Sequence, residues 1–242
     1  MPKSFFQTIY QDIKKNIENG LFSYQSLLMS ENELCAQYGC SRSTVRRALS
    51  ELSNDGYVQP IQGKGVRVIW RPETDDNMSF SMGGLESFYM AAKRLGFSYR
   101  TVIRAFERRE VDAACARTTG FAVGDCIFYI ERVRLADDVP VSIERSYLLE
   151  SEAPGLTKQD AEESLYAYIE GLGIGIGVGK RTITVEAATE DDLATLNLKS
   201  LPAVGVMRGQ HFDTNGTMFE YSEVRQHPYF FSVRETATRP TR

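Results

Sequence analysis

Two arginines four residues apart, Arg42 and Arg46, are suited to contact a polyanion. On a helix this spacing places both guanidinium groups on one face, away from the apolar Val45, Leu49 and Leu52. A short, exposed helix of this kind fits the major groove of DNA, where arginine contacts guanine O6 and N7 bidentately. The alternative is a solvated charged face, which any surface helix can show.

A second pair, Arg132 and Arg134, alternates with apolar residues in a β-rich run. Alternation directs both guanidinium groups to one face of a strand, where a phosphate or carboxylate would satisfy them. The alternative uses Glu144, because a three-residue hairpin loop at 137–139 would set it opposite Arg132 as an ordinary cross-strand pair. The residues alone favour neither interpretation.

Other motifs that carry chemistry are missing from the sequence. The four cysteines form no CxxC pair and both histidines lie far from the N-terminal cysteines, so we expect no metal site. No nucleophile–base pair or HExxH motif is present, which argues against an enzyme. The stretch 171–179, with its alternating glycines, fits neither nucleotide-binding motif, and we interpret it as a helix-to-strand connection. We therefore expect no cofactor.

Three helices and a hairpin must position the first arginine pair. Ser30 and Glu33 form a capping box that opens a short helix, Gly39 supplies its stop, and Ser41 is an N-cap candidate for the next helix. The predicted elements are helices over 5–19, between Ser30 and Gly39 and between Ser41 and Asn54, and then a hairpin over 57–69 with a glycine-rich, basic tip at 62–65.

The charge of the chain is divided unevenly between its two parts. Through Arg71 there are nine Lys/Arg against six Asp/Glu, a net charge of +3. The remainder has 19 basic against 26 acidic residues, a net charge of −7. A basic N-terminal part followed by an acidic remainder indicates that only the N-terminal part contacts a polyanion.

The polar stretch 71–84 is typical of a linker, so we predict a first domain over 1–70 and a second over 85–242. The second domain alternates strand-like runs with helical patterns, which favours an α+β fold with a largely antiparallel sheet. The predicted strands are 99–109, 126–135, 141–148, 180–187, 204–212, 218–225 and 230–235, and the predicted helices are 86–95, 112–119, 162–172 and 190–197.

The segment SENELCAQYGCSRSTVRRALSELSNDGYVQPIQGKGVRVI resembles the winged helix-turn-helix of the GntR transcription regulators, a likeness that covers about residues 5–70. The resemblance implies DNA contacts from the second helix, the third helix and the wing, which by matching position are Ser41, Arg42, Thr44, Arg46, Gly63 and Lys64. The family often reads P-S-E-R-E at the second helix, where this chain has Met29 and Asn32. One base contact is therefore altered, and Asn32 is suited to read adenine.

Later segments resemble the HutC-type effector domain called UTRA, which shares its fold with chorismate lyase. They are SFYMAAKRLG, IERVRLADDVPVSIERSYL, SLYAYIE and FEYSEVRQHPYFF, and GGLESF ahead of the first resembles trehalose operon repressors. The implied effector contacts are, by matching position, Ser87, Phe88, Arg132, Arg134, Glu144, Ser164, Glu220 and Tyr229. Ser87 also stands near a helix start, where free N–H groups favour anions, whereas strict alternation puts Tyr147 on the face opposite Glu144.

We predict a ligand-responsive, DNA-binding transcription regulator, a homodimer that binds a near-palindromic double-stranded operator. We expect it to repress a carbohydrate uptake or catabolism operon until a phosphorylated sugar releases it, with trehalose 6-phosphate ahead of an amino-sugar phosphate. With no secretory signal, and no apolar stretch longer than about half a bilayer span, we expect a cytoplasmic protein with no membrane partner. The alternatives are a chorismate lyase-like enzyme and a sugar sensor without DNA binding; the winged, arginine-bearing helix argues against the first, and a sequence-specific gel shift would exclude the second.

Overall fold

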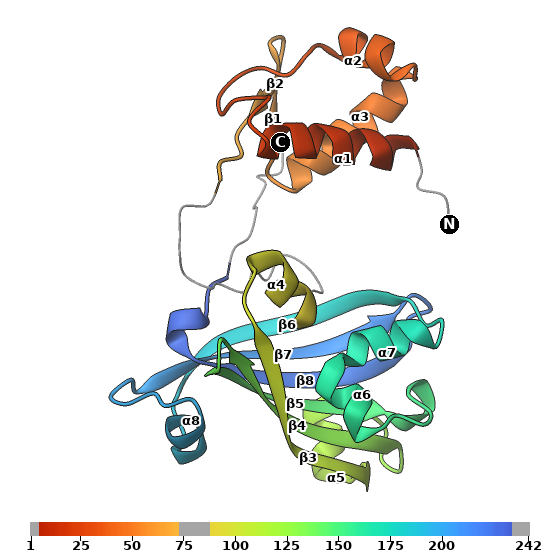
Figure 1. Ribbon diagram of the computed structural model, residues 1–242. Coiled ribbons are helices and arrows are strands. Elements are labelled where there is room, and N and C mark those ends of the chain that lie inside the picture. Colours follow the sequence, from red (N-terminus) through yellow and green to blue (C-terminus); the bar gives the residue numbers. More distant parts are fainter. Residues whose placement is uncertain (1–4, 73–87, 234–242) are drawn as a thin grey trace. The chain divides into compact units, whose positions relative to one another are not determined.

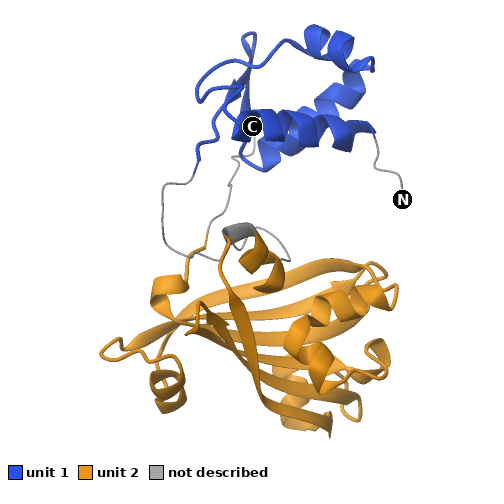
Figure 2. Ribbon diagram, in the orientation of Figure 1, with its two compact units in different colours: residues 1–76, 235–242 blue, residues 77–234 orange. Residues whose placement is uncertain are grey.

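The computed structural model describes residues 5–72 and 88–233, apart from the side chains of residues 94 and 95 (Figure 1). The chain divides into two units, with residues 5–72 in the first and 88–233 in the second (Figure 2). Each unit has its own buried apolar clusters.

The first unit consists of three helices followed by a two-stranded antiparallel hairpin, as predicted. The elements are α1 (Phe5–Glu18), α2 (Glu31–Tyr38), α3 (Arg42–Asn54), β1 (Val58–Ile61) and β2 (Gly65–Val68). Ile9, Ile13 and Ile17 of α1 pack with the apolar face of α3 in one buried cluster, which includes Val45 and Leu52. Burial of this periodic apolar face is what stabilises such short helices.

Local side-chain caps set the ends of α2 and α3, and they confirm the sequence-based prediction. The Glu33 backbone N–H donates to Ser30 Oγ at 3.3 Å, and the Ser30 N–H donates to Glu33 Oε2 at 2.8 Å. Gly39 ends α2 in the left-handed conformation, with φ of 61°. Ser41 then caps α3 by accepting the Thr44 N–H at 3.3 Å, so the turn between the two helices is fixed at both ends.

The second unit is built on one six-stranded antiparallel sheet with the order β3-β4-β5-β8-β7-β6. Its strands are β3 (Tyr99–Glu110), β4 (Cys126–Ala136), β5 (Val139–Leu149), β6 (Ile176–Ala187), β7 (Ala203–Asp213) and β8 (Met218–Gln226). Its helices are α4 (Phe88–Leu95), α5 (Ala113–Thr119), α6 (Lys158–Glu163), α7 (Leu165–Gly171) and α8 (Glu190–Thr195). The α+β class with an antiparallel sheet is therefore confirmed.

The two faces of this sheet differ. On the face that α6 and α7 cover (Figure 1), residues such as Ile130, Leu148 and Phe219 form a buried cluster with both helices. The opposite face carries alternating charges from strand to strand, and α8 reaches this row because Asp191 pairs with arginines of β3 and β5. The row is Arg104, Glu131, Arg145, Glu223 and Arg208, each ion-paired with the next.

Two predicted elements of the second unit are corrected by the structure. The helix predicted over 162–172 is two helices, α6 and α7, which meet at the extended residue Ser164. The strand predicted over 230–235 is wrong for its described part, because Pro228–Phe230 forms a 3₁₀ turn and 231–233 join no strand. The Phe230 carbonyl accepts a hydrogen bond from Gln226 Nε2 at 2.6 Å, so this acceptor is used in the turn and not in a sheet ladder.

The glycine-rich stretch is a connection only as far as residue 175, because β6 begins at Ile176. The turn between β7 and β8 presses against this stretch. A Cβ on Gly177 would lie 2.7 Å from the Asp213 carbonyl oxygen, and one on Gly175 would lie 2.9 Å from Thr214 Cγ2. Residue 177 therefore requires glycine, because the neighbouring atom is a backbone oxygen, whereas the side chain of Thr214 could turn away from a Cβ on residue 175.

Among the helices of the described residues, none has the length and apolarity to cross a bilayer. The four cysteines are free, and the described part of the chain gathers no three metal-ligating side chains into a cluster.

Candidate DNA-binding and effector sites

Helix α3 presents its arginines to solvent, because its apolar residues are turned into the core. Val45 and Leu49 are buried, whereas Arg42 and Arg46 are exposed on the other side of the helix. Ser41 is exposed at the N-cap, and half-buried Thr44 hydrogen-bonds to it at 2.9 Å between the two hydroxyl oxygens. The predicted contacts of this helix therefore lie together at and after its N-terminus.

An acidic residue that the sequence analysis did not single out holds Arg46. Its Nε lies 3.0 Å from each carboxylate oxygen of Glu31, the first residue of α2. The guanidinium group keeps its remaining N–H groups available at the exposed surface. The pair fixes the direction of Arg46 across the helix-turn-helix, and only the packing of α2 against α3 reveals it.

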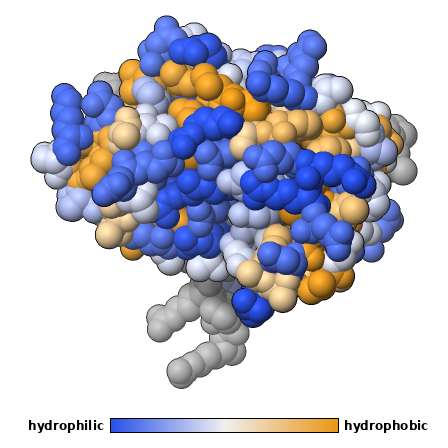
Figure 3. All heavy atoms as spheres, turned by 90° about the horizontal axis from the view of Figure 1, so that it is seen from below, coloured by the Kyte–Doolittle hydropathy of each residue, from blue (hydrophilic) through white to orange (hydrophobic). Residues whose placement is uncertain are grey.

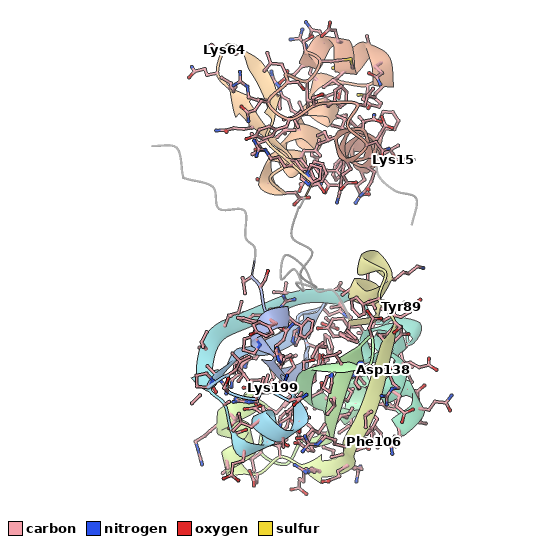
Figure 4. All side chains as sticks on the ribbon, turned by 60° about the vertical axis from the view of Figure 1, so that its left-hand side comes forward. Lys15, Lys64, Tyr89, Phe106, Asp138 and Lys199 are labelled. Carbon is pink, nitrogen blue, oxygen red and sulfur yellow. The ribbon has the colours of Figure 1, made fainter. Side chains whose placement is uncertain are left out.

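The wing and α2 carry the other residues predicted to contact DNA. Gly63 has φ of 71°, and the Lys64 N–H closes the turn by donating to the Ile61 carbonyl at 3.0 Å. Lys64 projects from the tip of the hairpin (Figure 4). Asn32 is exposed on the first turn of α2, so its amide is free to reach a base edge.

The second candidate site lies on the helix-covered face of the large sheet. Arg132 and Arg134 of β4 are 4% and 5% exposed. Arg134 donates to Glu144 Oε2 at 2.9 Å, and Arg132 forms an ion pair with the same oxygen at 3.1 Å. Arg132 and Glu144 are register partners, so the predicted cross-strand pair is present within an arginine cluster that is buried.

Further contacts leave one donor of this cluster without a partner. Arg132 donates to the Ala161 carbonyl at 3.3 Å and to Ser146 Oγ at 3.2 Å, but its buried Nε has no hydrogen-bond partner among the described residues. Arg134 donates to Thr101 Oγ1 at 2.7 Å and lies 5.4 Å from the centre of the Phe88 ring. A buried unsatisfied guanidinium N–H is costly, and an anion beside it would remove the cost.

Burial and the neighbouring charges shift the pKa values of the ionisable groups in this cluster. Burial, and next the charge of Arg134, lower the pKa of Arg132 to about 10. Burial acts to raise the pKa of Glu144, but the charges of Arg134 and Arg132 outweigh it and hold that pKa below its usual value. The two guanidinium groups therefore share one carboxylate in a medium that screens them poorly.

A second buried carboxylate, Glu220 of β8, stands beside this cluster. Among the described residues it has no hydrogen-bond or salt-bridge partner, although it lies opposite Leu148 of β5 and His211 of β7 in the sheet. His211 is held from both sides by hydrogen bonds of 3.0 Å, to Tyr166 of α7 and to Ser222. The long-range contacts of Tyr166 and His211 left no signal in the sequence.

The remaining predicted effector contacts are placed differently. Ser164 is nearly buried and caps α7, since the Ala167 N–H donates to its hydroxyl at 3.2 Å. Tyr229 is 70% exposed on the 3₁₀ turn after β8, outside the buried cluster. Tyr147 lies on the opposite sheet face against Tyr129, as alternation predicts, and Ser87 lies outside the described residues.

Residues 5–68 match the family described as "Bacterial regulatory proteins, gntR family", and residues 94–229 match the UTRA domain. The chain belongs to the GntR family. Its combination of an N-terminal helix-turn-helix and a UTRA domain is the HutC-type architecture.

Similar proteins span nearly the whole chain. The HTH-type transcriptional regulator TreR of Bacillus subtilis is 36% identical over 91% of both chains. A crystal structure of the possible transcriptional regulator YydK from Bacillus subtilis covers 98% of this chain and 100% of its own, with a TM-score of 0.78 and 23% identity. The effector-binding domain of the Bacillus subtilis trehalose repressor (TreR) covers 59% of this chain and 99% of its own, with a TM-score of 0.53 and 27% identity.

This membership makes the protein a DNA-binding transcription regulator, not an enzyme. GntR regulators bind operators through the helix-turn-helix and small-molecule effectors through the UTRA domain. The first unit described above is thus the DNA-binding unit, and the second is the effector unit.

Proposed function

We propose that the protein is a homodimeric repressor of a carbohydrate-utilisation operon, which a phosphorylated sugar releases from a near-palindromic operator. Within this proposal residues 1–70 bind DNA, 71–84 are the linker, and 85–242 bind the effector and dimerise. The family and the similarity to a trehalose repressor support an effector-controlled repressor of this kind. The buried arginine cluster supports an anionic ligand.

The observation that carries the effector proposal is a set of unused polar groups on one sheet face. In the part of the chain that the structure describes, Arg132 Nε is a buried donor without a hydrogen-bond partner, and Glu220 is a buried carboxylate without a hydrogen-bond or salt-bridge partner. Donors on an arginine pair suit a phosphate, and carboxylate acceptors suit sugar hydroxyls. We therefore assign the phosphate to Arg132 and Arg134 and hydroxyl groups to Glu144 and Glu220, and we place trehalose 6-phosphate ahead of an amino-sugar phosphate.

Calorimetry with trehalose and trehalose 6-phosphate tests this assignment. The phosphorylated sugar should bind at least about tenfold more tightly, since a charge-assisted pair contributes more than 1.4 kcal/mol. Arg132→Ala should remove that preference, and Arg132→Lys should keep the fold while losing part of it, because a lysine cannot bind bidentately. Arg108→Ala, which removes an exposed arginine, is the control. Equal affinity for both sugars would end the phosphate assignment.

For DNA we propose that α3 reads bases, through Arg42 and Arg46, while Lys64 contacts a phosphate. Arg42→Ala should weaken operator binding about ten- to hundredfold and relax base preference at one position of each half-site. Arg100→Ala serves as a matched control, because Arg100 is an exposed arginine of the effector unit. Unchanged operator affinity in Arg42→Ala would exclude α3 as the recognition helix.

A dimer follows from the geometry of recognition, since one winged helix reads a single half-site and twofold proteins read twofold DNA. The effector can change operator affinity only by its differential affinity for two arrangements of the recognition helices. Sedimentation of the full chain at micromolar concentration tests the dimer, and a monomer would contradict it.

A further inference from the structure

Helix α3 carries a third exposed arginine, Arg47, whose charge no carboxylate balances. Within residues 5–72 and 88–233 its side chain makes no hydrogen bond or ion pair, not even with Glu51, which stands one turn further along the helix. An arginine and a glutamate at this spacing are neighbours on the helix surface and commonly pair. The five N–H donors of the Arg47 guanidinium group are therefore available to a partner outside the chain.

Other exposed arginines of the protein are neutralised by a carboxylate. The surface of the effector unit presents many hydrophilic side chains (Figure 3), and there Arg100 and Arg108 are each ion-paired with an acidic residue. On α3 itself, Arg46 is paired with Glu31. Ordinary surface pairing therefore does not account for the side chain of Arg47.

The aromatic ring of Phe6 holds the Arg47 side chain instead. The guanidinium carbon lies 3.9 Å from the centre of that ring. Phe6 belongs to α1, where it is half-buried and packs against the core cluster of the DNA-binding unit, so the ring is itself fixed. A guanidinium group stacked on an aromatic face is oriented by the ring and keeps the N–H groups at its edge free to donate.

The two flanks of α3 consequently differ in charge. Arg46 turns toward α2, where Glu31 pairs with it, whereas Arg47 turns toward α1, where an uncharged ring holds it. A recognition helix in the major groove has a phosphate backbone on either side, and contacts to these phosphates set the position of the helix. The positive charge left over on α3 thus lies on the flank that faces α1.

We infer that Arg47, held on the Phe6 ring, binds a backbone phosphate of the operator on the side of α3 that faces α1. The planar fork of the guanidinium group matches two phosphate oxygens, and the ring sets its plane before DNA arrives. Arg47 is then a DNA-binding residue, and Phe6 is its positioning residue. This inference rests on the proposed role of α3 as the recognition helix.

Titration of the full chain with the operator duplex and with a duplex of unrelated sequence, at several salt concentrations, tests the contact. Arg47→Ala should weaken binding to both duplexes by a similar factor, because every sequence carries the phosphate. It should also reduce the slope of log affinity against log salt concentration by about 1 for each half-site. Lys15→Ala is the matched control, because it removes the same charge from an exposed position of α1, two residues beyond the buried Ile13. The control should leave the slope nearly unchanged.

A double-mutant cycle tests the role of Phe6. Phe6→Leu keeps an apolar side chain against the core cluster but removes the ring. It should weaken binding to both duplexes severalfold in the native chain and have no effect in the Arg47→Ala background, whereas the salt slope should stay unchanged, because Arg47 keeps its charge. If Phe6→Leu does not fold, Arg47→Lys decides: the charge and the slope should be kept, but affinity should fall, because an ammonium group cannot bind phosphate bidentately.

Three results would overturn the inference. An Arg47→Ala protein with the native salt slope makes no phosphate contact through this residue, and one that loses discrimination between the two duplexes would assign Arg47 to a base. Equal effects of Phe6→Leu with and without Arg47 would make the role of the ring purely structural.

Failure of the proposed function is distinguishable, because Arg42→Ala reports on α3 separately. If Arg42→Ala weakens operator binding and Arg47→Ala does not, only the phosphate contact is wrong. If neither substitution weakens it, α3 is not the recognition helix.

Discussion

Replacing Glu144 with glutamine tests the charge balance of the effector site. The substitution keeps the size of the side chain but removes the negative charge that both Arg132 and Arg134 share. The amide can still accept one hydrogen bond, while its NH₂ group sets donors against donors. Two buried guanidinium groups then repel each other with no carboxylate between them.

The magnitude follows from the burial of the three side chains. Removing one partner of a buried ion pair costs about 3–5 kcal/mol. Glu144 keeps 15% of its side-chain surface, so we expect the lower end, about 3 kcal/mol. For a unit of this size each kcal/mol lowers Tm by about 2–4 °C, so the effector unit should unfold about 6–12 °C earlier.

Scanning calorimetry of the full chain measures this shift, and the transition of the DNA-binding unit serves as an internal reference. Glu150→Gln is the matched control, because Glu150 makes two hydrogen bonds, of 2.6 and 2.8 Å, to the exposed Arg108. It should leave Tm within the scatter, since solvent screens an exposed pair. Added sulfate should recover more stability in Glu144→Gln than in the native chain, because an anion replaces the missing charge.

A Glu144→Gln protein that unfolds within about 2 °C of the native chain would refute the reasoning. The arginines would then be solvated in the absence of ligand, and their burial would not supply a preformed anion site.

Three further outcomes are expected. Lys64→Ala should weaken binding to all duplexes similarly and should reduce the slope of log affinity against log salt concentration by about 1. Arg46→Ala should instead reduce the discrimination between operator and unrelated DNA. Titrations of each variant at several salt concentrations separate the two effects. Glu31→Gln should raise affinity for every duplex, because a negative charge near the phosphates is removed. It should also reduce the ratio of operator affinity to affinity for unrelated DNA, because Arg46 loses the carboxylate that orients it. If that ratio does not change, Glu31 does not orient Arg46. Burial lowers the pKa of His211 below its usual value of 6.5. The folded state therefore binds fewer protons than the unfolded state, so stability is fully present above about pH 6.5 and is lost as the pH falls through the folded pKa. His211→Gln should flatten the pH dependence of Tm between pH 7 and 5; part of the slope should remain from His227, whose pKa burial also lowers.

Elements whose signals are local were predictable from the sequence. Ser30, Glu33, Gly39 and Ser41 act on backbone groups within a few residues, and all four adopt the predicted roles. The split of the predicted helix at Ser164 could not be predicted, because that residue closes α6 with its backbone and caps α7 with its hydroxyl. A continuous periodic pattern hides such a break.

Contacts that depend on packing between distant elements could not be predicted. Glu31 meets Arg46 only because α2 lies against α3. The partners of His211 come from a helix and a neighbouring strand, 45 and 11 residues away. The common face of Arg132 and Arg134 was readable from alternation, but whether that face is buried depends on the helices that cover it.

The β4–β5 turn constrains which insertions and deletions this lineage can accept. The hairpin closes through two residues, Asp137 and Asp138, both with positive φ, instead of the predicted three-residue loop. A bulge at Val141 then supplies the extra residue that brings Glu144 opposite Arg132. Loss of Val141 would remove the bulge and keep that pairing, whereas a residue gained before Glu144 would turn its carboxylate to the wrong face unless a second bulge absorbed it. Among related sequences, length changes in this hairpin should therefore be deletions that remove the bulge, and such deletions should leave the effector response unchanged.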